Sequence, residues 1–382
     1  MYQKIFSKSI EQHINKLPFQ AHSHHFWPDS GLKGVIQCWE DSIKLADTKW
    51  EKIFNQVIPQ AKNHILKSLN LKNQDQIVFA QNSHELIYRW LSSFSQNDLS
   101  ILTTDSEFYS LGRQLSRFKE EGVQVNYVET SSAKGESAEI ANLIIEHVQR
   151  LRPKVLIFSH VFFNSGFMIK LEDIQRILEQ APQDTHILID GYHAFATRNF
   201  DLSKIIQRAY YCAGGYKYAM VGEGACFLIT PENCQLRPRN TGWFANLEQL
   251  KNMDQKINYP GNAHRFLGST FDSTSLYRLN AVWDHFESLN LSLEDIHSYV
   301  LKLQKHFIKN LKNKDLLLLN DINSHAHFFT LQFESPMKAQ DFSQELSKRN
   351  VLMDQRKNLI RLGFGIYQTI EQVDKLLNIL NE

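Results

Sequence analysis

The sequence has few cysteines, and they are spaced too irregularly to suggest a disulfide framework. The 382 residues include four, Cys38, Cys212, Cys226 and Cys234, and none of them forms a Cys-x-x-Cys pair. In a chain of this size, such sparse cysteines do not indicate a secreted, disulfide-stabilised domain.

Long apolar segments are also missing. No apolar run approaches the roughly 20 residues that a membrane-spanning helix needs. The N-terminal stretch MYQKIFSKSIEQHINKL lacks the apolar core of a signal peptide. We therefore expect a cytoplasmic protein that makes no contact with a membrane.

The chain carries almost no net charge. Forty-two Lys and Arg residues face 41 Asp and Glu residues, for a formal net charge of +1. General binding of nucleic acid or of an anionic membrane would favour a basic excess, so we expect neither kind of binding. The composition, 42% hydrophobic and 22% charged, is typical of a globular protein with a substantial core.

The middle of the chain alternates short apolar runs with helix-like segments. The runs expected to be strands are 76–80, 99–105, 123–129, 155–163, 185–191, 208–214 and 225–230. Between most of them, apolar residues recur at the spacing of an amphipathic helix. This alternation predicts an α/β fold with a mainly parallel sheet flanked by helices.

The pattern of short apolar runs and helix-like segments changes near residue 245, where longer amphipathic helices begin. We predict a large domain over 46–260, followed by a linker helix and a smaller C-terminal α+β domain over 261–382. The first 45 residues contain Pro18, Pro28, Gly31 and Gly34 and are expected to be irregular. We expect this segment to pack on the small domain and the active site.

A carboxylate and an amine each follow one of the apolar runs. Asp190 ends ILID, and Lys217 follows AYYCAGGY. Ligands of open α/β sheets bind outside the carboxyl ends of the strands. A partly desolvated lysine there has a lowered pKa and a nucleophilic amine, and a carboxylate facing a pyridine nitrogen is what pyridoxal phosphate needs. The simpler alternative is that the two residues cap their strands and form a partly buried ion pair.

Three further features follow other strands. Asn82 or Ser83 is placed to cap a helix whose backbone N–H groups could bind phosphate. Phe108 could cover a planar cofactor, and Asn164 offers a neutral hydrogen-bonding side chain. Each also has an ordinary explanation, as a cap, a core aromatic or a turn residue; their occurrence together at successive strand ends favours a cofactor site.

Several motifs resemble those of fold-type-I pyridoxal-phosphate enzymes of the class V aminotransferase group, which includes kynureninases and cysteine desulfurases. The similar stretches are DGYHAF, AGGYKY, GEGACFL, TGWF and RLGFG, within roughly residues 75 to 370. Within the group the chain looks most like kynureninases, because Tyr216 directly precedes Lys217 and TGWF occupies 241–244.

The resemblance implies a role for each matching residue around pyridoxal 5'-phosphate. Lys217 would form the Schiff base and Asp190 would face the pyridine nitrogen. The other implied cofactor contacts are His193 near the phenolic oxygen or phosphate, Phe108 on the ring, Asn164, and Asn82, Ser83 and Tyr216 at the phosphate. Trp243 and Thr270 (or Ser269) would complete the phosphate site from the second subunit of a homodimer.

The resemblance also implies that the substrate is a small molecule, an α-amino acid, and that Arg361, in LIRLGFG, binds its α-carboxylate. A guanidinium suits this role because it can hold a carboxylate through two parallel hydrogen bonds. Lys217, Asp190 and His193 would form the catalytic set.

The chain departs from the kynureninase pattern at three places. Ala245 and Asn246 follow TGWF, Leu111 stands where an aspartate is expected, and GSTF replaces Gly-Thr-Pro. Cysteine desulfurases need a mobile cysteine in their C-terminal part, whereas the last cysteine here is Cys234. We therefore expect a pyridoxal-phosphate enzyme acting on an α-amino acid, with kynureninase-like C–C hydrolysis, transamination and β-elimination as alternatives. A non-catalytic binding protein of the same fold is the alternative from a different class.

Three histidines lie close together in HSHHFW, at His22, His24 and His25. Zinc sites usually draw their ligands from separated elements, and a chain with sixteen histidines will contain local groups of them. We predict no metal site, and the resemblance favours a segment that faces the substrate.

Overall fold

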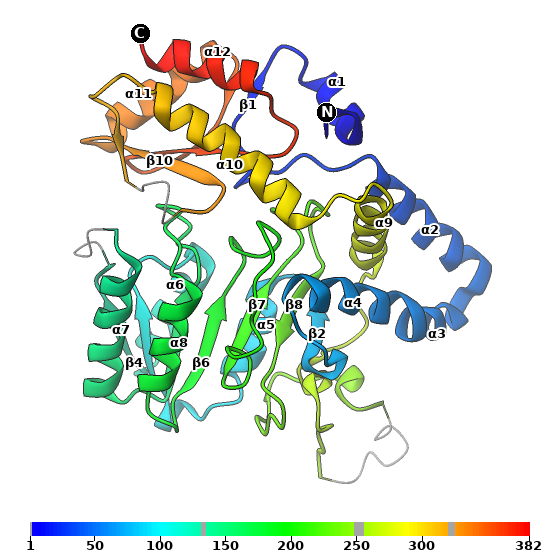
Figure 1. Cartoon of the computed structure of the whole chain (residues 1–382). Helices are drawn as coiled ribbons and strands as arrows, with labels where there is room; N and C mark the ends of the chain where they lie inside the picture. Colours follow the sequence, from blue (N-terminus) through cyan, green and yellow to red (C-terminus); the bar gives the residue numbers. More distant parts are fainter. Residues whose placement is uncertain (1, 131–134, 248–255, 320–324) are drawn as a thin grey trace.

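The computed structural model describes residues 2–130, 135–247, 256–319 and 325–382. A larger lobe contains a seven-stranded sheet of order β2-β8-β7-β6-β5-β3-β4 (Figure 1). The strands are β2 (Ile77–Ala80), β3 (Ser100–Thr104), β4 (Gln124–Val128), β5 (Val155–Ser159), β6 (His186–Asp190), β7 (Ala209–Ala213) and β8 (Cys226–Ile229). The pairs from β4 to β7 are parallel, and β8 is antiparallel to both of its neighbours. The predicted α/β fold with a mainly parallel sheet is confirmed.

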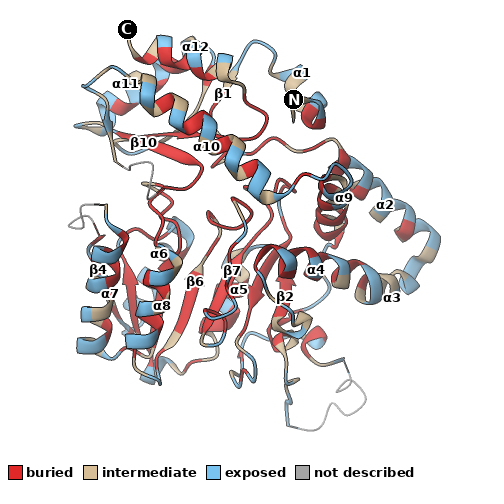
Figure 2. Ribbon diagram, in the orientation of Figure 1, coloured by how far each residue is buried: buried red, intermediate tan, exposed pale blue. Residues whose placement is uncertain are grey.

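Helices cover both faces of this sheet. Alternate side chains of a strand point to opposite faces, so Ile187 and Ile189 of β6 belong to one core cluster and Leu188 to another. The first cluster includes residues of α4 (Ile58–Ser68), α7 (Ser137–Leu151), α8 (Leu171–Gln180) and α9 (Thr274–Ser288). The second includes residues of α5 (Ser83–Leu91) and α6 (Tyr109–Glu120). The sheet between them is almost wholly buried (Figure 2).

The smaller lobe has its own sheet and its own core. Its four strands have the order β12-β13-β10-β9, with β9 (Leu317–Leu318), β10 (Phe328–Gln332), β12 (Asp354–Arg356) and β13 (Leu359–Gly363). Three helices, α10 (Leu293–Asn310), α11 (Pro336–Lys348) and α12 (Ile370–Leu380), contribute to a third apolar cluster with strands β10 and β13. The carboxyl ends of the parallel strands in the larger lobe face this smaller lobe (Figure 1).

The N-terminal segment differs from the expected irregular structure, because residues 30–45 form a long helix. This helix, α2 (Ser30–Leu45), packs along α9. A Cβ atom on Gly34 would lie 2.5 Å from the carbonyl oxygen of Tyr277, so the glycine permits close approach of the two helices. Glycines that suggested a loop therefore serve helix packing. The earlier part of the segment does reach the small lobe, where β1 (Leu17–Pro18) pairs with β11 (Val351–Leu352).

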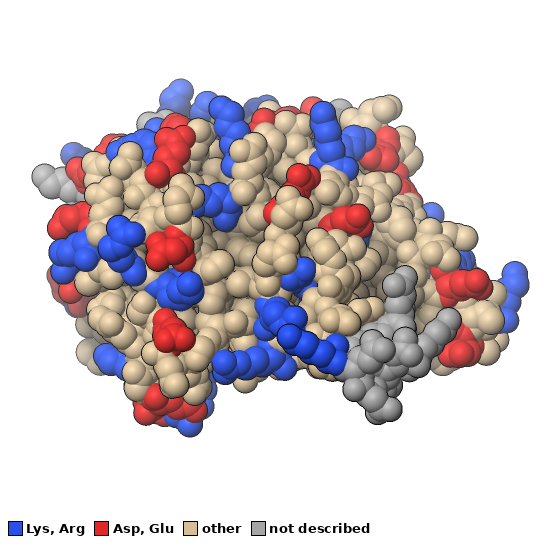
Figure 3. Space-filling view, turned by 90° about the horizontal axis from the view of Figure 1, so that it is seen from below, with Lys and Arg blue, Asp and Glu red and all other residues tan. Residues whose placement is uncertain are grey.

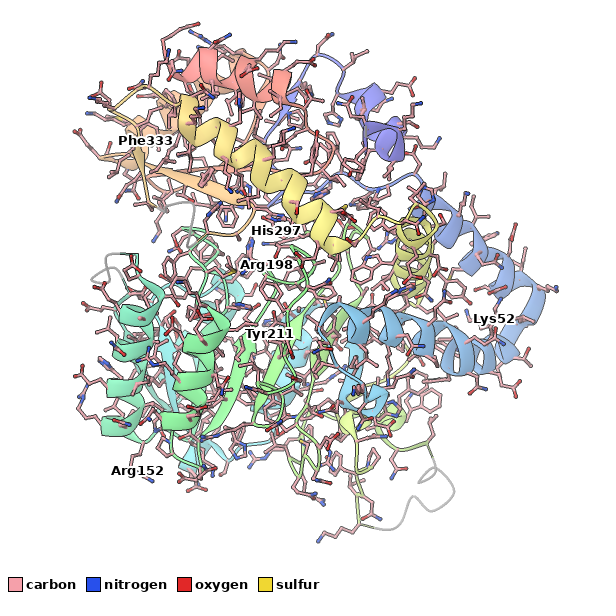
Figure 4. All side chains as sticks on the ribbon, in the orientation of Figure 1. Lys52, Arg152, Arg198, Tyr211, His297 and Phe333 are labelled. Carbon is pink, nitrogen blue, oxygen red and sulfur yellow. The ribbon has the colours of Figure 1, made fainter. Side chains whose placement is uncertain are left out.

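The lobes meet around Arg198 and His297, which lie close together in Figure 4. Both line a cavity of about 590 Å³, to which α10 and the loop between β6 and β7 contribute. This cavity shares no lining residue with the one that Lys217 lines.

The outer surface reflects the balanced composition. Figure 3 shows acidic and basic side chains intermixed over the face seen from below, with many neutral residues between them. Within the described residues, no helix has the length and apolar character needed to cross a membrane.

Candidate active site

A cavity of about 720 Å³ brings together most of the residues selected from the sequence. It opens at the carboxyl ends of β5, β6 and β7, on the side of the small lobe. The predicted residues that line it are Asn82, Ser83, Phe108, Asp190, His193, Tyr216, Lys217 and Arg361. They come from five separate segments of the chain, as expected of a ligand site at the end of an open sheet.

Lys217 lies in the loop after β7, which ends at Ala213. A Cβ atom on Gly214 would collide with Sγ of Cys226, and one on Gly215 with the side chain of Val221. The two glycines therefore let the loop turn tightly against its neighbours. This packing brings the lysine amine into the cavity.

The amine of Lys217 is held between aromatic rings and an imidazole. Nζ shares a hydrogen bond with Nε2 of His193 and lies 5.9 Å from the ring centre of Phe108 and 5.7 Å from that of Tyr192. Its pKa is lowered to about 7, first by burial and then by the positive charge of Arg361, against the opposing charge of Asp190. The same burial keeps the pKa of His193 well below its ordinary value. Near neutral pH, a large fraction of the lysine is thus a neutral amine.

The lowered pKa predicts how the cofactor-free protein captures pyridoxal phosphate. Only the unprotonated amine reacts, so the capture rate should rise about tenfold between pH 6 and pH 8, with a midpoint near pH 7. Rapid-mixing absorbance measurements over this range test the expectation. Nα-acetyl-lysine, whose free side-chain amine has an ordinary pKa of about 10.4, is the control. Its reaction with pyridoxal phosphate should still become faster above pH 9. A capture rate of the protein that keeps rising above pH 9, as that of the control does, would contradict the lowered pKa of Lys217.

Asp190 is the last residue of β6, and its carboxylate is fixed at the base of the cavity. Oδ1 accepts a hydrogen bond of 2.9 Å from the backbone N–H of Tyr192. Burial raises the pKa of Asp190, and the Tyr192 N–H and the charge of Lys217 oppose that rise. A partly desolvated carboxylate at this position is suited to hold a proton on a facing ring nitrogen.

A second carboxyl group, Glu107, lies behind this site and was not identified from the sequence. It accepts hydrogen bonds from the Ser159 hydroxyl (2.6 Å), the Ser159 N–H (3.1 Å) and the Thr104 hydroxyl (2.6 Å). Burial is the main cause that raises its pKa to about 7, and the nearby charge of Asp190 adds to the rise. Ser159 stands opposite Asp190 in the parallel register of β5 and β6. Glu107 directly precedes Phe108, but nothing in the sequence indicates that its side chain turns inward.

The beginning of α5 forms one end of the cavity. Asn82 caps this helix, since its side-chain oxygen accepts a hydrogen bond of 2.8 Å from the N–H of Glu85. Gln81 and Ser83 line the cavity beside it. The free N–H groups and the positive dipole end of a helix favour an anion such as phosphate.

Arg361 lies at the opposite side, on β13. Its neighbours Ile360 and Leu362 are buried in the core of the small lobe, as the alternation of a strand predicts. Its Nε and Nη2 donate to Oδ1 of Asp354 at 3.1 and 2.7 Å, and its Nη1 donates to the carbonyl oxygen of Phe163. The arginine is therefore ion-paired and also lines the cavity.

The structure places three of the other predicted residues away from the cavity. Asn164 uses its side-chain oxygen to accept a hydrogen bond of 2.8 Å from the N–H of Ser165, and its neighbour Phe163 lines the cavity instead. The indole of Trp243 donates to the hydroxyl of Ser269 at 3.1 Å, and both side chains are exposed, as is Thr270. A contribution of these residues from a second subunit remains a prediction.

The N-terminal histidines lie beside the site. Nδ1 of His24 is 3.0 Å from the hydroxyl of Tyr216, and Ser23 lines the cavity. His22 is fully buried and stacks on Phe328 with ring centres 4.8 Å apart. Among the described residues, the one group with metal-ligand spacing is elsewhere, at His64, Asp284 and Glu287.

The donor set fits pyridoxal phosphate, which combines an aldehyde, a pyridine ring and a phosphate. The cavity places an amine, a carboxylate at a strand end, an aromatic face and a helix N-terminus around one space. Together these features define an α/β protein with the site of a Schiff-base-forming pyridoxal-phosphate enzyme.

Comparison with known proteins agrees. A model of the family Aminotransferase class-V matches residues 45–376, so the chain belongs to that family. Class V aminotransferases use pyridoxal phosphate, as the sequence resemblance implied. An uncharacterized protein of Schizosaccharomyces pombe, C11D3.10, is 23% identical over 85% of this chain and 74% of its own length. The uncharacterized aminotransferase C777.03c of the same yeast is 19% identical over 86% and 83%.

Solved structures show the same fold at low sequence identity. The cystine C–S lyase C-DES, in complex with its reaction product cysteine persulfide, has a TM-score of 0.84 and 16% identity, covering 98% of this chain and 99% of that one. The cysteine desulfurase of Thermococcus onnurineus NA1 has a TM-score of 0.77 and 14% identity, covering 98% and 97%.

Proposed function

We propose that this protein is a pyridoxal-phosphate-dependent enzyme that acts on an α-amino acid through Schiff-base exchange at Lys217. The observation that carries the proposal is the position of Lys217, whose amine lies in one cavity with Asp190, Phe108 and Arg361. When bound, pyridoxal phosphate acts as an electron sink for bonds at Cα of the attached amino acid.

The residues of the chain then have separate tasks. Asp190 holds a proton on the pyridine nitrogen, and Phe108 offers its ring to one face of the cofactor. Arg361 binds the α-carboxylate of the substrate. Once the substrate amine has replaced its own, Lys217 is a free base that can take the proton from Cα.

Asp190→Asn tests the role of the carboxylate. This variant keeps the shape of the side chain but cannot hold the ring nitrogen protonated, so turnover should fall on the order of 10²- to 10⁴-fold, with weaker cofactor retention. Asp105→Asn is a matched control, because Asp105 follows strand β3 of the same sheet and does not line the cavity. Steady-state rates and cofactor absorbance measure both effects. Unchanged turnover in Asp190→Asn would exclude the proposed role.

Several reactions can follow removal of the proton from Cα of the substrate. Kynureninase-like C–C hydrolysis is suggested by Tyr216–Lys217 and TGWF. Leu111, at the position where kynureninases have an aspartate, is buried in the core and adds no polar group to the cavity. Transamination and β-elimination share the same first step and use the same residues. A homodimer, with Trp243 and Thr270 reaching the partner's cavity, is part of the proposal.

Persulfide transfer through a cysteine of the protein has little support. Cys226 is the one cysteine that lines the cavity, and its thiol lies 3.5 Å from the hydroxyl of Tyr192. Burial is the main cause that raises its pKa to about 12, so it is a thiol rather than a nucleophilic thiolate.

A product screen by mass spectrometry separates the reactions. It should include kynurenine and 3-hydroxykynurenine among common amino acids. Anthranilate with alanine indicates the hydrolase, a keto acid formed only with an added amino acceptor indicates the aminotransferase, and a keto acid with ammonia indicates the lyase. A yellow protein whose spectrum no amino acid shifts would favour a non-catalytic binding protein.

A further inference from the structure

Arg356 lines the same cavity as Lys217 and Arg361, and the proposed function gives it no role. It is the last residue of β12, which pairs with β13 so that Asp354 stands opposite Arg361. Residues two apart on a strand share a face, as do directly paired residues of neighbouring strands. Arg356, Asp354 and Arg361 therefore lie on one face of the small sheet, at the cavity.

Asp354 holds the two guanidinium groups side by side. One carboxylate oxygen is 2.7 Å from Nη2 of Arg361, and the other is 3.0 Å from Nη2 of Arg356. The side chain of Arg361 is 4% exposed, whereas that of Arg356 is 44% exposed. The first arginine is thus fixed at the base of the group, and the second reaches the open part of the cavity.

Most hydrogen-bond donors of Arg356 remain available to a ligand. Apart from Asp354, its one hydrogen-bond partner within the described residues is the backbone oxygen of Gln355, at 3.4 Å from Nη1. A guanidinium has five N–H donors in a planar fork that matches a carboxylate. Two guanidinium groups share one carboxylate here, so this side of the cavity keeps an excess of positive charge. The nearby charge of Arg356 also contributes to the lowered pKa of Lys217.

We infer that Arg356 binds a second anionic group of the substrate, and that the substrates are α-amino acids with an acidic side chain. The inference rests on the proposed function, in which Arg361 takes the α-carboxylate. The two carboxylates of aspartate or glutamate are separated by only two or three carbon atoms, which suits two guanidinium groups that share one carboxylate. Kynurenine, with a neutral side chain, does not use this second contact.

Matched pairs of amino acids test the inference by their dissociation constants, measured as spectral shifts of the enzyme with bound cofactor. L-aspartate is compared with L-asparagine, and L-glutamate with L-glutamine, so that only the side-chain charge differs. We expect each acid to bind on the order of tenfold more tightly than its amide. Arg356→Gln should remove this preference and leave the dissociation constants of the amides unchanged. Lys357→Gln is the control: it removes the adjacent positive charge at a residue that does not line the cavity, and it should keep the preference.

The outcomes are distinct. If Arg356→Gln weakens the binding of acids and amides equally, Arg356 only positions Arg361 through Asp354, and the inference is overturned. A native enzyme that binds the amides as well as the acids overturns it too. A protein that shows no cofactor absorbance overturns the proposed function itself, whereas colour without a preference for acids overturns only this inference.

Discussion

Replacing Lys217 by alanine is expected to give a folded protein from which borohydride no longer yields a covalently attached cofactor. The amine lies in the cavity and has a pKa lowered to about 7, so its loss removes both the Schiff-base nucleophile and the proposed base at Cα. Turnover should fall at least about 10³-fold. Intact-mass measurements after reduction give the covalent yield, and circular dichroism checks the fold.

Lys62→Ala is the matched control for this experiment. Lys62 is also buried, and burial lowers its pKa to about 8, but its amine bonds to His264 and does not line the active-site cavity. This variant should keep both the covalent yield and the turnover. Full cofactor attachment in Lys217→Ala would show that another lysine carries the cofactor.

Arg361→Lys should weaken the binding of amino acid substrates on the order of tenfold or more, about 1.5–3 kcal/mol for a charged hydrogen-bonded contact. The substitution keeps the positive charge but loses the planar fork of donors. Asp354 would still be paired with Arg356, so no carboxylate is left alone. Cofactor binding and colour should be retained, because Arg361 lies on the small lobe, across the cavity from α5.

Spectral titration with amino acids measures the change, and Arg349→Lys is the control. Arg349 belongs to the same lobe and is ion-paired with Glu345 and Glu382, but it is not among the residues that line the cavity. Unchanged substrate affinity in Arg361→Lys, or loss of the cofactor, would show that the α-carboxylate is held elsewhere.

The parts of the site that could be predicted from sequence are those fixed by local pattern. ILID places Asp190 at the end of a strand, and strand alternation places Arg361 opposite the core side chains Ile360 and Leu362. Asn82 is followed by a helix that its side chain caps. In each case a period of two or a helix-start signal decides the direction of the side chain.

The remaining parts depend on tertiary packing, which a single sequence does not encode locally. Asn164 and Phe163 are neighbours in an irregular loop, and no periodicity indicates which one faces the cavity. Gly31 and Gly34 suggested a loop, whereas the structure uses Gly34 for close contact between two helices. The pairing of Arg356 with Asp354 and Arg361 required the register of two strands.

The central claim is that Lys217 carries pyridoxal phosphate, and one measurement on the unmodified protein tests it most directly. The protein is incubated with pyridoxal phosphate at pH 8, reduced with borohydride, digested and mapped by mass spectrometry. The account predicts one dominant modified peptide, with the cofactor on Lys217 and little label on Lys62, and release of that label when an amino acid substrate is added before reduction. A dominant label on Lys62 or on a surface lysine, with Lys217 unmodified, would contradict the account.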